Sequence, residues 1–212
     1  MKLYDYWRST AAYRVRIALN LKGIHYQPIP VNLLGGEESG AAYRCLNPQG
    51  LVPTLLDGDQ VLTQSLAICE YLEETRPAPA LLPASPGARA RVRALAQVIT
   101  CDIHPLNNLR VLTYLVDDLG VAESDKLAWY RHWVAQGLSA LEAMLTSAEE
   151  TGRFCHGDEP GLADLCLIPQ LYNARRFDCE LTNYPRLTGI ESACQTLPAF
   201  LAAEPQRQSD AR

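Results

Sequence analysis

Apolar and polar residues change their spacing several times within the first 75 residues of the chain. Short apolar runs over 2–7, 26–33, 52–56 and 60–62 have the length and residue content of strands. Helical spacing runs from Ala12 to the stop signal Lys22-Gly23, and again over 41–46 and 65–75. The predicted order is βαβαββα. Because a helix separates the first two strands, these should be parallel, whereas the turn at Asp57-Gly58 should make the last two antiparallel.

The pattern changes after a proline-rich stretch that contains Pro77, Pro79, Pro83 and Pro86. Beyond it the strand signal stops, and residues 88–119, 124–148, 161–176 and 187–203 have helical spacing. We therefore predict an α/β domain over residues 1–78, a linker over 79–86 and an all-helical domain over 87–212.

Composition excludes several classes of function. The formal net charge of −5 disfavours nucleic acid as a partner, because phosphate binding needs a basic surface. No apolar run approaches the roughly 20 residues that span a bilayer, and charges replace the apolar core of a signal peptide, so we expect a cytoplasmic protein without a membrane partner. The seven cysteines and four histidines lack metal-ligand spacing, so no metal is expected.

Two features of the first domain suggest a binding site. Pro53 interrupts an apolar strand pattern, which favours either an edge strand or a cis bond after Val52; in this frame we expect the cis bond. Ser65 is predicted to cap the helix that follows, and the pair Gln64-Ser65 at a helix N-terminus also suits a small carboxylate.

The junction of the first strand and the first helix carries Arg8-Ser9-Thr10. These hydroxyls either cap the helix or, with the helix dipole, stabilise an anion such as a thiolate by lowering its pKa.

Two arginines of the helical domain continue apolar stripes. Arg110 follows Leu106 at a spacing of four, and Arg176 follows Tyr172 in the same way. An inward guanidinium is costly unless it is paired, so the two residues indicate either snorkelling side chains or an anion pocket. The excess of arginine over lysine has two explanations, genome base composition or recognition of carboxylates.

Several segments together resemble the zeta class of the glutathione transferases, the family of maleylacetoacetate and maleylpyruvate isomerases. The resemblance covers nearly the whole chain. Its carriers are WRSTAAYRVRIALNLKG (7–23), NPQGLVPTL (47–55), QSLAICEYLEE (64–74), CDIHPLNNLRVL (101–112), GDEPGLADLCLIPQ (157–170) and ARRF (174–177).

The resemblance implies a thioredoxin-like N-terminal domain, an all-α C-terminal domain, a homodimer and glutathione as cofactor. It assigns the γ-glutamyl end of glutathione to Gln64 and Ser65, backbone hydrogen bonds to Val52 beside cis-Pro53, and donation to the thiolate to Ser9. By the same resemblance Thr10 supplies a second hydroxyl and Arg8 stabilises the enolate. The remaining implied residues are Gln49, Asp102, His104 and Asn108 for the cofactor, and Arg8, Arg110 and Arg176 for the substrate. Asp102 and His104 either reach the glutathione of a neighbouring subunit, as the resemblance implies, or pack within their own helix.

Two positions depart from the family pattern. Ala11 stands where a cysteine is usual, which excludes a protein thiol as nucleophile at this site. Gly161 replaces the usual hydroxyl cap of the helix that contains Asp164, a change that helices tolerate.

The implied reaction is a cis–trans isomerisation in which glutathione is recovered, with a maleyl keto acid as substrate. Leu109 favours maleylacetoacetate, the intermediate of tyrosine and phenylalanine breakdown, since maleylpyruvate isomerases of gentisate degradation can carry a second arginine there. A glutathione transferase acting on small halo acids and a non-catalytic binding protein are the alternatives.

Overall fold

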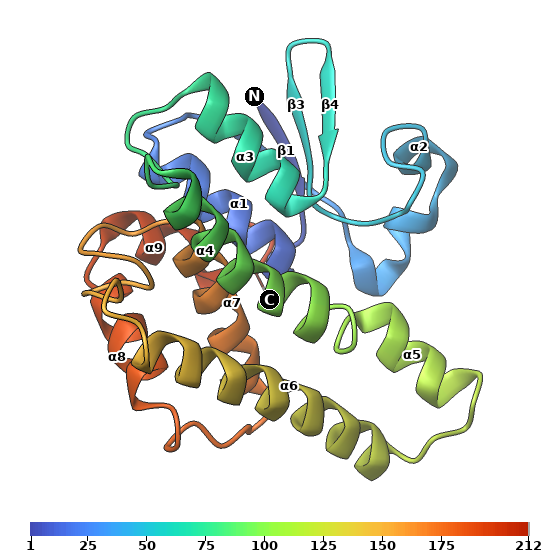
Figure 1. Cartoon of the computed structure of the whole chain (residues 1–212). Helices are drawn as coiled ribbons and strands as arrows, with labels where there is room; N and C mark the ends of the chain where they lie inside the picture. Colours follow the sequence, from blue (N-terminus) through green and yellow to red (C-terminus); the bar gives the residue numbers. More distant parts are fainter. Residues whose placement is uncertain (212) are drawn as a thin grey trace. The chain divides into compact units, whose positions relative to one another are not determined.

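The computed structural model describes residues 1–211 and divides into two compact units. The first contains residues 1–81 together with the C-terminal segment that starts at Gln195, and the second contains Leu82–Cys194. Figure 1 shows the course of the chain from the N-terminus in blue to the C-terminus in red.

The first unit is built on a four-stranded mixed sheet in the order β2-β1-β3-β4. Strand β1 pairs with β2 in parallel and with β3 in antiparallel register, and β3 and β4 form an antiparallel hairpin. The predicted topology is therefore confirmed. The strands are β1 (Lys2–Asp5), β2 (Gln27–Pro30), β3 (Thr54–Asp57) and β4 (Gln60–Thr63).

Helices α1 (Thr10–Leu21) and α3 (Ser65–Thr75) lie side by side in this unit (Figure 1). The cross-strand pair Leu3 and Leu55 is fully buried, as are Val15 of α1 and Ile68 of α3. These apolar side chains form a core between sheet and helices. Smaller elements are α2 (Ala41–Arg44), α9 (Pro198–Ala203) and three 3-10 turns, Leu33–Gly35, Glu37–Ser39 and Pro205–Arg207.

The boundary between the two units falls within the proline-rich stretch. Lys22 donates from Nζ to the backbone oxygens of Arg76 (2.7 Å) and Pro79 (2.8 Å), and the N–H of Leu81 donates to Glu73 at 2.8 Å. These bonds keep the start of the predicted linker, 79–86, in the first unit.

The end of the chain differs from the expectation for residues 187–203. Two helices, α8 (Pro185–Cys194) and α9, replace the single predicted helix, because Pro198 cannot continue a helix from the preceding residues. Helix α9 packs against α1, so the segment from Gln195 belongs to the first unit, although the sequence analysis grouped it with the helical domain 87–212. Residue 212 lies outside the described residues.

The second unit is helical, which confirms the predicted fold class. Helices α6 (Glu123–Thr146) and α7 (Leu162–Arg176) match the predicted ranges closely, and α6 buries Val134, Leu138 and Leu141 at helical spacing. Among the described residues, no helix has both the length and the apolar character needed to cross a membrane.

The long helix predicted over 88–119 is wrong. Helix α4 (Pro86–Gln97) leads into a π-helical turn (Val98–Ile103), and α5 (Leu109–Asp117) starts afresh. The N–H of His104 donates to Ile99, five residues back, at 2.8 Å. Pro105 then ends the helix because it has no N–H to donate.

Candidate active site

A tight turn joins β1 to α1. The N–H of Ser9 donates to the carbonyl of Tyr6 at 2.8 Å, so Trp7 and Arg8 are the two central residues of the turn. Ser9 is the N-cap of α1, and its Oγ accepts a hydrogen bond from the N–H of Ala12 at 3.2 Å. Since this bond uses only a lone pair, the hydroxyl proton of Ser9 can be donated to an anion.

The three candidate residues of this turn differ in exposure. Thr10 is only 3 % exposed, whereas Arg8 and Ser9 are partly exposed. The guanidinium of Arg8 lies 4.1 Å from the centre of the Trp7 ring, a cation–π contact. The structure therefore offers Arg8 and Ser9 to a ligand more readily than Thr10.

The segment before β3 holds Val52-Pro53, and the peptide bond between them is cis, as predicted. Two side chains fix this segment, because Tyr43 Oη and Asn47 Nδ2 each donate to the carbonyl of Leu51 at 2.7 Å. Burial raises the pKa of Tyr43, so its hydroxyl keeps its proton and remains a donor.

An apolar cluster brings this segment and the β1–α1 turn together. Val52, Tyr43, Tyr6 and Trp7 belong to it, and each is at most 8 % exposed. Val52 and the turn that carries Ser9 therefore belong to one packed region.

Gln64 precedes α3 with φ 67° and ψ 115°, a conformation that costs a residue other than glycine of order 1–3 kcal/mol. Gln64 is the N-cap, and the predicted capping role of Ser65 is wrong because Ser65 is already the first helical residue. Within the described chain no side chain caps α3, so its first N–H groups and the positive end of its dipole suit an anion. Gln49 contacts this position, accepting a hydrogen bond from Gln64 Nε2 at 2.7 Å.

Ser65 is buried and has a cationic neighbour. Arg14 of α1, itself 2 % exposed, donates from Nη1 to Ser65 Oγ at 3.2 Å. Arg14 thus adds positive charge near the N-terminus of α3, where a carboxylate would bind. No prediction from the sequence included Arg14, although Arg14, Ala18 and Leu21 share one helical stripe, as do Arg110 and Arg176 with the apolar residues before them.

The remaining candidates belong to the second unit. Asp102 is exposed and lies within the π-helical turn, and His104, which directly follows that turn, is partly exposed. Asn108 is the N-cap of α5, and its Oδ1 accepts a hydrogen bond from the N–H of Arg110 at 3.1 Å.

The inward orientation predicted for Arg110 and Arg176 within the helical domain is wrong, since both residues are exposed in this structure. Arg110 does not continue the apolar stripe of the preceding helix, because the helix is interrupted between Leu106 and Leu109. Arg176 is the last residue of α7, and its guanidinium lies 5.0 Å from the centre of the Phe177 ring. Both guanidinium groups are therefore accessible to an anionic ligand.

Comparison with known proteins agrees with this geometry. The glutathione S-transferase N-terminal domain model matches residues 1–74. A probable maleylacetoacetate isomerase of Vibrio cholerae is 51 % identical over 211 residues, covering 99 % of this chain and 97 % of the relative. A maleylpyruvate isomerase of Ralstonia is 50 % identical over 210 residues, covering 99 % of both.

Solved structures give the same result. The holo structure of a maleylpyruvate isomerase, described as a bacterial zeta-class glutathione S-transferase, superposes with a TM-score of 0.98 at 49 % identity and full coverage of both chains. A maleylacetoacetate isomerase of Methylobacterium extorquens AM1 with bound malonate and glutathione has a TM-score of 0.97 at 46 % identity, again with full coverage of both chains.

A mixed βαβαββα sheet with a cis-proline before its third strand, followed by a helical unit, is the architecture of the glutathione transferases. The chain belongs to this family, and within it to the zeta class of maleylacetoacetate and maleylpyruvate isomerases.

Proposed function

We propose that the chain is a glutathione-dependent cis–trans isomerase of maleyl keto acids, with maleylacetoacetate as its principal substrate and fumarylacetoacetate as the product. One observation carries the proposal. The first unit combines a hydroxyl donor at the start of α1 with an α3 N-terminus that lacks a side-chain cap and has a buried arginine close by.

The residues fit glutathione. Its γ-glutamyl carboxylate suits the first N–H groups of α3, which starts at Ser65 directly after Gln64, and Arg14 supplies the positive charge. Gln49 extends this site through its contact with Gln64. Val52, beside the cis-proline, offers its backbone groups to the peptide part of glutathione. By resemblance to the zeta class, Asn108 is also proposed to bind glutathione.

When bound, glutathione would supply a thiolate for reversible addition to the cis double bond, which would leave a single bond that can rotate before elimination of the thiolate restores the double bond. The chain must keep that sulfur ionised, and the Ser9 hydroxyl and the N-terminus of α1 both favour the anion. Thr10 is buried, so we assign it to support of the turn and not to contact with sulfur.

The cationic residues serve the substrate. Arg8 adjoins Ser9 and is proposed to stabilise the negative charge that develops on the substrate carbonyl. Arg110 and Arg176 are proposed to bind its carboxylates, for which the planar guanidinium fork is suited.

Leu109 favours maleylacetoacetate over maleylpyruvate, because an arginine at this position would add a further carboxylate-binding group. The test is a comparison of kcat/KM for maleylacetoacetate, maleylpyruvate and dichloroacetate at one glutathione concentration. The proposal expects the highest value for maleylacetoacetate. A higher kcat/KM for maleylpyruvate would show that maleylpyruvate is the preferred substrate. A higher kcat/KM for dichloroacetate would show that the chain is mainly a glutathione transferase and not an isomerase.

We further propose a cytoplasmic homodimer, in which Asp102 and His104 reach the glutathione of the neighbouring subunit. The free state of all seven cysteines suits a reducing compartment. Analytical ultracentrifugation tests the assembly, and a monomer at assay concentrations would contradict it.

A further inference from the structure

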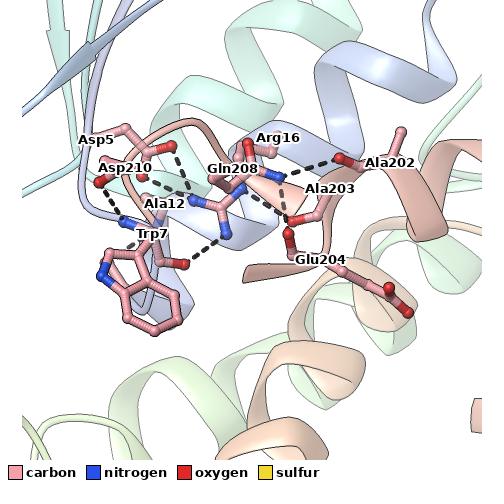
Figure 2. A network of polar contacts seen from close by, with 10 residues as sticks. Asp5, Trp7, Ala12, Arg16, Ala202, Ala203, Glu204, Gln208 and Asp210 are labelled. Atoms are coloured by element: carbon pink, nitrogen blue, oxygen red, sulfur yellow. Dashed lines mark hydrogen bonds and ion pairs between the residues drawn. The ribbon is translucent and has the colours of Figure 1, made fainter. Parts of the chain in front are cut away.

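The turn that carries Arg8 and Ser9 leaves two main-chain groups of Trp7 without a partner inside the turn itself. Its closing hydrogen bond joins Ser9 to Tyr6. Trp7 is only 7 % exposed, and buried main-chain N–H and C=O groups need partners. Both partners of Trp7 come from other parts of the first unit (Figure 2).

On the amide side, the N–H of Trp7 donates to Asp210 Oδ2 at 3.1 Å, across 203 positions of sequence. On the carbonyl side, Trp7 accepts a hydrogen bond from Arg16 Nη2 at 3.0 Å. Arg16 also donates from Nε to the carbonyl of Ala203, the last residue of α9, at 3.0 Å. The C-terminal segment thus holds Trp7 directly through Asp210 and indirectly through Arg16 (Figure 2).

The guanidinium of Arg16 has a fixed position. It is fully buried, and its Nη1 donates to both carboxylate oxygens of Asp5 at 2.8 Å. Burial raises the pKa of Asp5, and the charge of Arg16 opposes that effect. The side chain of Asn20 ties α1 to the same segment by donating to the carbonyl of Ala199 at 3.1 Å.

The apolar cluster is a further contact with this segment. Ala211 packs against the group that contains Trp7 and Val52. The end of the chain therefore touches both the main chain of Trp7 and the cluster that supports the cis-proline.

We infer that residues 198–211 are a positioning element for the active site, with Asp210 as its positioning residue. By fixing Trp7, this segment fixes the ring on which the Arg8 guanidinium lies and the turn that presents the Ser9 hydroxyl. The effect on catalysis rests on the proposed function, whereas the effect on Trp7 does not depend on it.

The first experiment measures amide hydrogen exchange of Trp7 in the full chain. In Asp210→Ala, exchange should be about tenfold faster, because a hydrogen bond to a charged group is lost. Asp210→Asn keeps an oxygen acceptor and should restore most of the protection. Glu204→Ala is the matched control, since its carboxylate pairs with Arg207 and not with Trp7. Unchanged Trp7 exchange in Asp210→Ala, or equal acceleration in Glu204→Ala, would overturn the inference.

The second experiment measures steady-state isomerisation of maleylacetoacetate by the same variants. Asp210→Ala should lower kcat by roughly tenfold and leave the KM for glutathione within about twofold, because Val52, Gln64 and Ser65, and not the turn, are proposed to hold the cofactor. Asp210→Asn should recover much of kcat, which also keeps the test decisive if the alanine variant does not fold. Faster Trp7 exchange with unchanged kcat would overturn the positioning role. If the wild-type chain has no isomerase activity, the proposed function is contradicted but the inference about Trp7 is not. The exchange rates then test the hydrogen bond between Trp7 and Asp210 without any activity measurement.

Discussion

The side chain of Gln64 donates a hydrogen bond to Gln49 Oε1 at 2.7 Å, and it does so from a backbone with φ 67°. A residue that keeps such a conformation at the N-terminus of α3 holds local strain at the place where the cofactor is proposed to bind.

Because of this strained backbone, replacement of Gln64 should stabilise the fold and at the same time weaken the binding of glutathione. Gln64→Gly should raise the free energy of unfolding by roughly 1 kcal/mol, because glycine adopts φ near +67° without the cost of a Cβ. The same change should weaken glutathione binding by removing the side chain. Denaturant unfolding and calorimetric titration measure the two effects. Gln49→Ala is the control, since it removes the hydrogen-bond partner and keeps the strain, so it should not stabilise the chain.

Replacement of Ser9 distinguishes its role as the N-cap of α1 from its proposed role as a hydrogen-bond donor to the thiolate. In Ser9→Gly the helix loses only a few tenths of a kcal/mol, because glycine is tolerated at the N-cap. The hydroxyl donor to the thiolate is lost, so kcat/KM should fall by about 100-fold and the pKa of bound glutathione should rise. Ultraviolet titration of the thiolate in the complex measures that pKa. An unchanged thiol pKa in Ser9→Gly would show that Ser9 only caps the helix.

The three proposed substrate arginines should respond differently to alanine. Arg8→Ala should lower kcat by about 100-fold, since it removes charge stabilisation in the transition state. Arg110→Ala and Arg176→Ala should mainly raise the KM for the dicarboxylate by roughly tenfold or more. Arg153→Ala is the control, because Arg153 is exposed and has no role in the proposed site. If Arg8→Ala and Arg176→Ala both retain wild-type isomerisation, the assigned roles are wrong.

Much of the first unit follows from the sequence because its signals are local. Strand alternation, the Lys22-Gly23 stop and the proline after Val52 each act over a few residues. The helices of the second unit were harder to predict from the sequence. The apolar spacing of a helix continues through Pro105 in the sequence, whereas the helical backbone is interrupted there. That break changed the environment expected for Arg110.

For the candidate site, too, only residues with local sequence signals could be predicted. Ser9, Val52 and Gln64 were found from helix starts and an anomalous proline. Arg14, Arg16 and Asp210 act through tertiary contacts, two of them with residues 51 and 187 positions away and one across 203 positions. Sequence spacing carries no direct signal of such pairs.

Asp164 should be the main polar support of α7. Its two carboxylate oxygens accept hydrogen bonds from the N–H groups of Gly161 (2.8 Å) and Cys155 (2.9 Å). Asp164→Asn leaves a single acceptor oxygen and should lower the free energy of unfolding by roughly 1–3 kcal/mol. Asp158→Asn, where an exposed carboxylate binds the N–H of Arg153, should cost less than about 0.5 kcal/mol.

The cost of Asp164→Asn should also depend on pH. Burial raises the pKa of Asp164 from 3.8, although its N–H donors oppose the shift. A carboxyl with a raised folded-state pKa contributes stability that is present below about pH 4 and lost as the pH rises through the folded pKa. The asparagine variant does not titrate, so the difference in unfolding free energy should be larger at about pH 4.5 than at about pH 7. Urea unfolding at both values measures it, and a difference that grows with pH would contradict the raised pKa.

The central claim is that glutathione is required and is recovered. The most direct measurement follows the conversion of maleylacetoacetate to fumarylacetoacetate with glutathione at about one hundredth of the substrate concentration. We predict complete conversion, no conversion without glutathione, and unmodified glutathione at the end. Conversion that stops when glutathione is consumed, with a stable glutathione adduct as product, would contradict the account and identify a transferase instead.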